Sequence, residues 1–206
     1  MPAAQGQVGQ QTNSNGLTPI QGFRQLAQGD LAVSELHGRY FEQGRYGNMF
    51  SAANQAAQAV SAALATTYTG LCLYNPVGSG VMLVPNKLKL ALSVAPAAIA
   101  TLGLIAGFAA TGGVTVQTTK LTNQSSQIGS ASGGKGIALS AATIVTPTWA
   151  FHLLDGATLT AFPAATGLFD LEGLFQIMPG GFLALGALTA VTGLGSIVWE
   201  EVPITT

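Results

Sequence analysis

The sequence predicts an all-β protein, an antiparallel sandwich that follows an extended N-terminal arm. The clearest observation is the alternation in residues 87–94, where every second residue is Leu or Val and the others are Lys, Ala or Ser. Only a strand with one buried face requires an apolar period of two residues. A second observation is that short apolar segments recur between turns rich in Gly and Pro, a spacing that is typical of sandwiches and barrels.

The chain of 206 residues is long enough for one domain and an arm. Residues 1–20 are rich in Gln, Gly, Asn and Ser, lack charged side chains and show no apolar periodicity. Such an arm is either disordered or lies over a neighbouring subunit, and the sequence leaves both open. Charges gather in residues 23–46, of which residues 23–36 are compatible with a short helix. We therefore expect the arm and charged segment over residues 1–50 and the sandwich over residues 51–206.

The centre of the predicted fold is a β-hairpin followed by a third strand. Two apolar runs, 71–74 and 81–84, flank the six-residue turn NPVGSG and predict the hairpin. The alternating strand 87–94 begins after a Pro-Asn pair. The Ala-rich residues 51–65 lack a helical stripe of large apolar residues, so we expect strand and loop there.

The remaining strands are predicted from apolar or β-branched segments between turn sequences. Asp155-Gly156, residues 179–181 and residues 192–195 are turn sequences, and strands joined by such turns predict an antiparallel meander. Residues 122–135 are rich in Ser and Gly, and we expect an exposed loop that contacts a partner. The expected strands are residues 99–108, 114–121, 137–145, 148–154, 158–162, 171–178, 182–191 and 196–202.

The low charge content restricts the partners of this protein. Charged residues make up 7% of the chain, whereas ordinary soluble domains have about 25%. A surface with so few charges is usually covered by other chains or by lipid. The net charge of −1 and the lack of a Lys/Arg cluster argue against nucleic acid as a partner.

Burial in lipid is the weaker of the two explanations. Residues 90–119 contain no charged residue and are long enough to span a bilayer. However, they include Pro96 and four Gly residues, and no Lys/Arg-rich flank sets an orientation. The N-terminus also lacks a basic segment followed by an apolar one, so a secretory signal is not expected. We therefore expect no membrane partner.

No cysteine or histidine is predicted to be catalytic or to bind a metal. Cys72 lies in a predicted strand and is expected to be a buried small apolar residue rather than a nucleophile. His37 and His152 lack the spacing of metal ligands, although one His per chain could meet its copies at a trimer axis. By alternation His152 lies on the same face as Ala150 and opposite Trp149, which predicts an outward-facing or interface residue.

The carboxylates also favour structural interpretations. Asp170 and Glu172 are two residues apart and could form an acid–base pair or a calcium site, but a solvated edge or loop is preferred because no ligand loop surrounds them. Glu200 and Glu201 lie on alternate faces of the last predicted strand. One of the two is expected to face inward, toward a lysine of residues 87–94 or a backbone donor, because a buried charge needs a partner.

The glycine-rich residues 129–135, GSASGGK, are superficially similar to a phosphate-binding loop. The motif is incomplete, because Gly136 stands where Ser or Thr is required. The chain has no G-x-S-x-G sequence, and no Ser/His/Asp set can be assembled. We therefore expect no enzyme active site and no cofactor.

Two segments carry a resemblance to a known class of proteins. They are TYTGLCLYNPVGSGVMLV at residues 67–84 and PGGFLALGALTAVTGLGSIVWEEVPI at residues 179–204. They resemble the jelly-roll structural proteins of tailed bacteriophage virions, the capsid cement and decoration proteins especially. The resemblance implies a jelly-roll-like sandwich, often trimeric, that binds a capsid or tail surface and has no enzymatic site. Trimeric jelly rolls of the tumour-necrosis-factor type share such strand and turn patterns.

The resemblance and the low charge together predict a non-enzymatic virion protein, a capsid cement or decoration protein that stabilises the phage head lattice. The expected partners are further copies, as a homotrimer, and the major capsid protein or other virion proteins at the capsid surface. The alternative is a receptor- or glycan-binding jelly-roll module of a tail fibre or head fibre. Aromatic residues in loop 122–135 or around Trp149 would favour that alternative, and the loop contains none.

Overall fold

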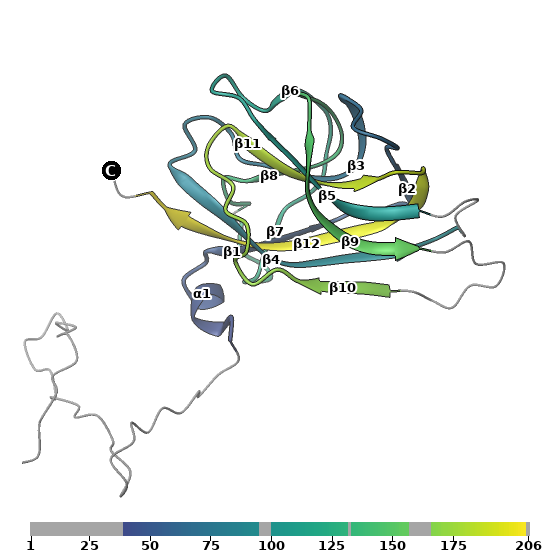
Figure 1. Ribbon diagram of the computed structural model, residues 1–206. Helices are drawn as coiled ribbons and strands as arrows, with labels where there is room; N and C mark the ends of the chain where they lie inside the picture. Colours follow the sequence, from purple (N-terminus) through teal and green to yellow (C-terminus); the bar gives the residue numbers. More distant parts are fainter. Residues whose placement is uncertain (1–38, 95–99, 132, 157–165, 205–206) are drawn as a thin grey trace, which may run out of the picture. The chain divides into compact units, whose positions relative to one another are not determined.

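The computed structural model describes residues 39–94, 100–131, 133–156 and 166–204 (Figure 1). The chain divides into two units, Met1–Phe41 and Glu42–Thr206. The second unit, which begins at Glu42, holds the sandwich. The expected arm over residues 1–20, the short helix over residues 23–36 and the strand over residues 158–162 lie outside the described residues.

The described part of the chain is almost entirely β-structure. A single short helix precedes a series of strands, and tight turns or loops connect them. The elements are α1 (Phe41–Arg45), β1 (Met49–Ala53), β2 (Gln58–Val60), β3 (Thr67–Tyr74), β4 (Val81–Leu92), β5 (Ala100–Phe108), β6 (Val114–Lys120), β7 (Gln124–Ser125), β8 (Ile137–Ile144), β9 (Thr148–Gly156), β10 (Thr166–Asp170), β11 (Gly181–Ala187) and β12 (Val191–Pro203).

The strands form two antiparallel sheets that face each other (Figure 1). The β12 sheet has the order β10-β4-β12-β1-β7, with β2 paired to β12 as well, and the β11 sheet has the order β6-β8-β3-β11-β5-β9. Strands far apart in the sequence are neighbours, such as β3 with β11 and β4 with β12. The predicted all-β antiparallel sandwich is therefore confirmed.

Apolar side chains fill the space between the sheets. Trp199 of β12 and Leu83 of β4 have no exposed surface, and Leu73 and Leu183 face them from the β11 sheet. The neighbours of these β11-sheet residues point the other way and form a second buried cluster, which includes Phe182. Because both faces of β11 are buried, its sequence is apolar throughout instead of alternating.

The prediction of a hairpin between residues 71–74 and 81–84 is wrong. Strand β3 pairs with β8 and β11, whereas β4 pairs with β10 and β12, so the two strands lie in opposite sheets. The connection crosses between the sheets and is held by Asn75, whose buried Nδ2 donates to the carbonyl oxygens of Val81 and Ile177 at 2.8 Å each. A hairpin and a crossover both need two apolar runs and a turn, so the local pattern does not distinguish them.

Strand β4 continues through Pro85 and Asn86, where the sequence suggested an interruption. The register with β12 shifts at this point and leaves Asn86 without an opposite residue, so Asn86 is the extra residue of a β-bulge. The bulge absorbs the proline without ending the strand. Beyond it the predicted alternation holds at Leu88 and Leu90, which are buried, and at Lys89, which is exposed, but β4 ends at Leu92 and Val94 is 59% exposed.

The prediction of a C-terminal meander is also wrong. Strands β8 and β9 do not pair with each other, and β11 and β12 belong to different sheets. Asp155-Gly156 lies at the end of β9 rather than in a turn, and residues 192–195 lie within β12. The glycines of β12 serve close packing instead: a Cβ on Gly193 would be 2.6 Å from the Ala91 carbonyl oxygen.

Two further sequence segments behave differently from expectation. Residues 171–178 were expected to form a strand, but Glu172 has a positive φ of 42° and Leu171 accepts a turn hydrogen bond from Leu174. Strand β10 precedes this turn and pairs with β4. Residues 90–119, the candidate membrane segment, contribute the end of β4, β5 and most of β6.

A first prediction concerns the core. Replacing Leu83 by Ala should lower the free energy of unfolding by about 3 kcal/mol, because the side chain is fully buried between the sheets. The matched control is Leu188→Ala, since Leu188 is 56% exposed in the connection between β11 and β12. The control should change stability by less than about 0.5 kcal/mol in urea denaturation. Equal losses in the two variants would contradict the placement of Leu83 in the core.

Candidate functional site

A buried carboxylate in β12 organises one end of the sandwich. The Glu201 side chain accepts hydrogen bonds from the backbone N–H of Lys135 at 2.8 Å to both oxygens, from that of Gly136 at 2.8 Å and from the Trp199 indole Nε1 at 3.2 Å. The expectation that one glutamate of the pair faces inward toward a backbone donor is confirmed, and Glu201 is that glutamate. Its charge is balanced by aligned N–H dipoles rather than by a lysine.

The same contacts explain why residues 129–135 are similar to a phosphate-binding loop. The backbone N–H groups of Lys135, the last of these residues, and of Gly136 after it do bind an anion, but that anion is the carboxylate of Glu201 in the same chain. Gly134 has a φ of +72°, and a Cβ at this position would lie 2.5 Å from Glu201 Oε1. The glycines therefore allow the loop to close over the carboxylate, and the N–H groups of Lys135 and Gly136 are already used within the protein.

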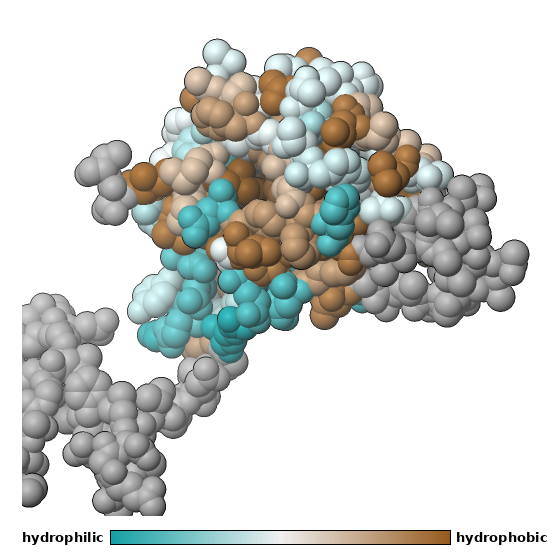
Figure 2. Space-filling view, viewed as in Figure 1, coloured by the Kyte–Doolittle hydropathy of each residue, from teal (hydrophilic) through white to brown (hydrophobic). Residues whose placement is uncertain are grey.

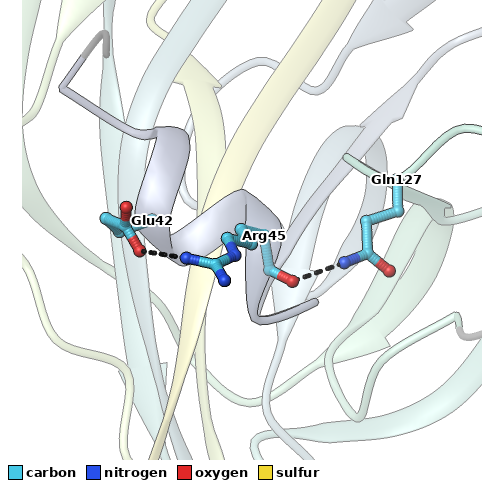
Figure 3. Close-up of polar contacts among 3 residues, drawn as sticks. All are labelled: Glu42, Arg45 and Gln127. Carbon is cyan, nitrogen blue, oxygen red and sulfur yellow. Dashed lines mark hydrogen bonds and ion pairs between the residues drawn. The ribbon is translucent and has the colours of Figure 1, made fainter. Parts of the chain in front are cut away.

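Further hydrogen bonds hold loop 122–135 against the rest of the sandwich. Asn123 Nδ2 donates to the carbonyl oxygens of Gly133 and Gly136 at 2.9 and 2.7 Å, which closes the base of the loop. Gln127 Nε2 donates to the Arg45 carbonyl oxygen at 2.7 Å and so joins the loop to α1 (Figure 3). The loop, which includes β7, is consequently anchored at its base and along its side.

Two exposed apolar side chains flank this junction of loop and helix. Ile128 follows Gln127 and is 85% exposed, and Tyr46 follows Arg45 and is 67% exposed. Arg45 also forms an exposed ion pair with Glu42 at 3.7 Å (Figure 3). We call Tyr46, Gln127 and Ile128 the loop–helix surface, because the exposed residues follow the two partners of the hydrogen bond between Gln127 and Arg45.

Polar and apolar residues are unevenly distributed over the surface. In the view of Figure 2, hydrophilic residues gather around α1, whereas hydrophobic and weakly polar residues cover much of the strand surface above it. Asp170, at the end of β10, is paired with Lys87 at 3.2 Å. Glu172 is exposed in the turn that follows. The preferred interpretation of Asp170 and Glu172 as a solvated edge or loop is confirmed.

The remaining candidate residues are also placed by the structure, except His37, which lies outside the described residues. Cys72 is fully buried in β3, and burial raises the pKa of its thiol, so it is a small apolar core residue as expected. His152 is exposed on β9, as expected, but its ring stacks on Trp149 at 5.2 Å. Register shifts in the pairing of β9 with β5 bring these two residues to the same side, contrary to simple alternation.

Sequence reasoning missed an apolar groove beside the edge strand β9. The groove has a volume of about 410 Å³ and lies between the ends of β5 and β9 and the segment that leads into β11. Its lining combines distant parts of the sequence, so no local pattern could have indicated it. The residues that line it are Ala106, Gly107, Phe108, Thr148, Phe175, Gln176, Ile177, Met178, Gly181, Phe182 and Leu183.

Among the described residues, no three His, Cys, Asp or Glu side chains are close enough to hold a metal ion together. In the part of the chain that the structure describes, no helix has the length and apolar character that crossing a membrane requires. Comparisons of the chain with protein-family models, with curated proteins and with solved structures find no match. The candidate functional surfaces are therefore the loop–helix surface and the groove.

A second prediction tests the role of Glu201. Replacing it by Gln should lower the free energy of unfolding by about 2–3 kcal/mol, because charge-assisted hydrogen bonds to backbone N–H groups are lost. Amide hydrogen exchange at Lys135 and Gly136 should accelerate, since these two groups donate to the carboxylate. Unchanged exchange at both amides would show that the carboxylate does not hold the loop.

Glu200→Gln is the matched control, and it should change the free energy of unfolding in the opposite direction. Burial raises the pKa of Glu200 above its ordinary value, so folding disfavours its charged form. The resulting penalty is absent at low pH, where Glu200 is protonated in both states, and it develops as the pH rises through the ordinary pKa toward the raised one. Glu200→Gln removes the penalty, so its stability relative to the unmodified protein should increase with pH across that interval.

Proposed function

We propose that this protein is a non-enzymatic structural protein of a tailed-phage virion, a cement or decoration protein that binds the capsid lattice in many copies. In this proposal the copies associate as a homotrimer at the capsid surface. The single observation that carries the proposal is an anchored loop that presents an almost fully exposed Ile128 on a charge-poor sandwich. Such a side chain contributes little to the fold and is suited to a pocket on a partner.

The loop–helix surface supports the proposal through its preorganisation. The Glu201 and Asn123 hydrogen bonds hold the base of loop 122–135, and Gln127 fixes its side to α1. A loop that is already ordered loses little conformational entropy when it binds, so a small apolar contact can contribute to affinity. Repeated over many lattice positions, weak contacts of this kind add through avidity.

The low charge supports a lattice partner in particular. Charged residues are 7% of the chain, and those near α1 include an exposed Arg45–Glu42 pair of opposite signs. A surface of this kind provides little long-range electrostatic attraction, so recognition depends on shape and apolar contact. That mode of recognition suits a partner presented at high local density, as a capsid lattice is.

A receptor- or glycan-binding module of a tail or head fibre is the second candidate. It is favoured by the stacked rings of Trp149 and the exposed His152 on β9. Flat rings at an exposed strand are suited to pack against sugar rings. Binding of the purified chain to a glycan array, abolished by His152→Ala and not by Ile128→Ser, would favour this candidate over capsid attachment.

A third prediction tests capsid attachment. The purified chain should co-sediment with empty capsids assembled from the major capsid protein of the same genome. Ile128→Ser and Tyr46→Ala should each weaken binding at least tenfold, because each removes a side chain of the proposed lattice contact. Both side chains are exposed, so their removal leaves core packing intact. Leu188→Ser is the matched control and should bind normally. Leu188 is exposed before the start of β12, whereas Glu201, which holds loop 122–135, lies near the end of that strand. No binding by the unmodified chain would refute the proposal.

A further inference from the structure

A second apolar surface lies at the edge of the sandwich formed by β9. Phe108 is 63% exposed and Met178 is 48% exposed, and both line the groove described above. Val77 and Phe108 both approach Gly180, and the ring of Phe175 meets that of Phe151 edge-on at 6.3 Å. We call Val77, Phe108, Phe151, Phe175 and Met178, together with the groove, the apolar patch.

The patch has the size of apolar patches that are often functional. Its exposed side chains present on the order of 400 Å² of apolar surface, within the range of the largest patches found on monomeric proteins, which are often functional. Phe108 projects at the end of β5, while the groove beside it is a depression of about 410 Å³. A projection next to a depression is the shape that lets a surface fit a copy of itself.

The lack of charged residues in the groove favours a second copy of the chain as the partner that covers the patch. None of the residues that line the groove is charged, and Thr148 and Gln176 are the only ones with polar side chains. When copies assemble around a symmetry axis, residues near the axis meet their own counterparts, so any net charge there repels itself. An uncharged patch is free of this cost, whereas a partner of different sequence would gain specificity from complementary charges.

The two edge strands of the β11 sheet, β6 and β9, argue against association by strand pairing. The register of β9 with β5 shifts twice, and that of β6 with β8 shifts three times, so both edges of the β11 sheet are irregular. Bulged edges are poor templates for an added strand. Contact at this side of the molecule is therefore expected through side chains in the groove rather than through continuous sheets.

We propose that the apolar patch is the surface through which copies of this chain associate, with the patch of one copy packed against the patch of the next. Phe108 of each copy lies at the contact and enters the groove of its neighbour. This inference rests on the self-association in the proposed function but not on capsid attachment. It assigns the two exposed apolar surfaces to different partners, the loop–helix surface to the lattice and the apolar patch to a second copy.

The test uses charge reversal in the full-length chain and sedimentation equilibrium without capsids. Phe108→Asp and Phe108→Lys should each raise the dissociation constant at least tenfold, because each variant places like charges against each other. An equimolar mixture of the two variants should recover part of the association, because opposite charges then meet at two of the three contacts of a mixed trimer. Recovery is expected only if position 108 faces its own counterpart or lies beside it.

The controls separate loss of association from loss of folding. Leu188→Asp and Leu188→Lys are matched changes at a site that is 56% exposed at the opposite end of β11, and they should leave association unchanged. Val77→Asp, at the part of the patch that lies in the exposed crossover, repeats the test if Phe108 variants lose the β-sheet circular dichroism of the unmodified chain. Ile128→Ser should associate normally while failing to bind capsids. A monomeric unmodified chain at its highest soluble concentration, or undiminished association of the folded patch variants, would overturn the inference.

Discussion

The Glu201 carboxylate is the constraint on which one end of this molecule depends. Desolvation of a carboxylate is tolerated only where donors surround it, and here the donors are the indole of the buried Trp199 and the backbone of Lys135 and Gly136. This contact joins the centre of the β12 sheet to the loop that leads into β8. It also holds the base of loop 122–135, the loop on which Ile128 is exposed.

The two exposed apolar surfaces have different structural origins. The loop–helix surface lies where the hydrogen bond between Gln127 and the Arg45 carbonyl joins loop 122–135 to α1. The apolar patch arises where β5, β9 and the approach to β11 meet at the irregular edge of the β11 sheet. In a chain with ordinary charge content, lysines and glutamates would interrupt both surfaces.

Some features of the site could be predicted from the sequence. The exposure of loop 122–135 followed from its Ser- and Gly-rich composition, and the inward carboxylate followed from two adjacent glutamates in a strand whose faces differ. The donors to that carboxylate could not be predicted, because Lys135 and Gly136 lie 65 or more residues away in the chain. The groove was missed for the same reason, since Phe108, Thr148 and Met178 meet only in the folded protein.

By itself the sequence determined that the chain is an all-β sandwich, because period-two alternation and Gly- or Pro-rich punctuation are local properties of strands. It placed most strand positions correctly, including β5, β6 and β8. Only the tertiary structure decided which strands pair: the run before Asn75 joins one sheet and the run after it joins the other. Pairing is decided by burial and by contacts between distant segments, such as Asn75 with Ile177, and a local pattern of apolar residues contains no information about them.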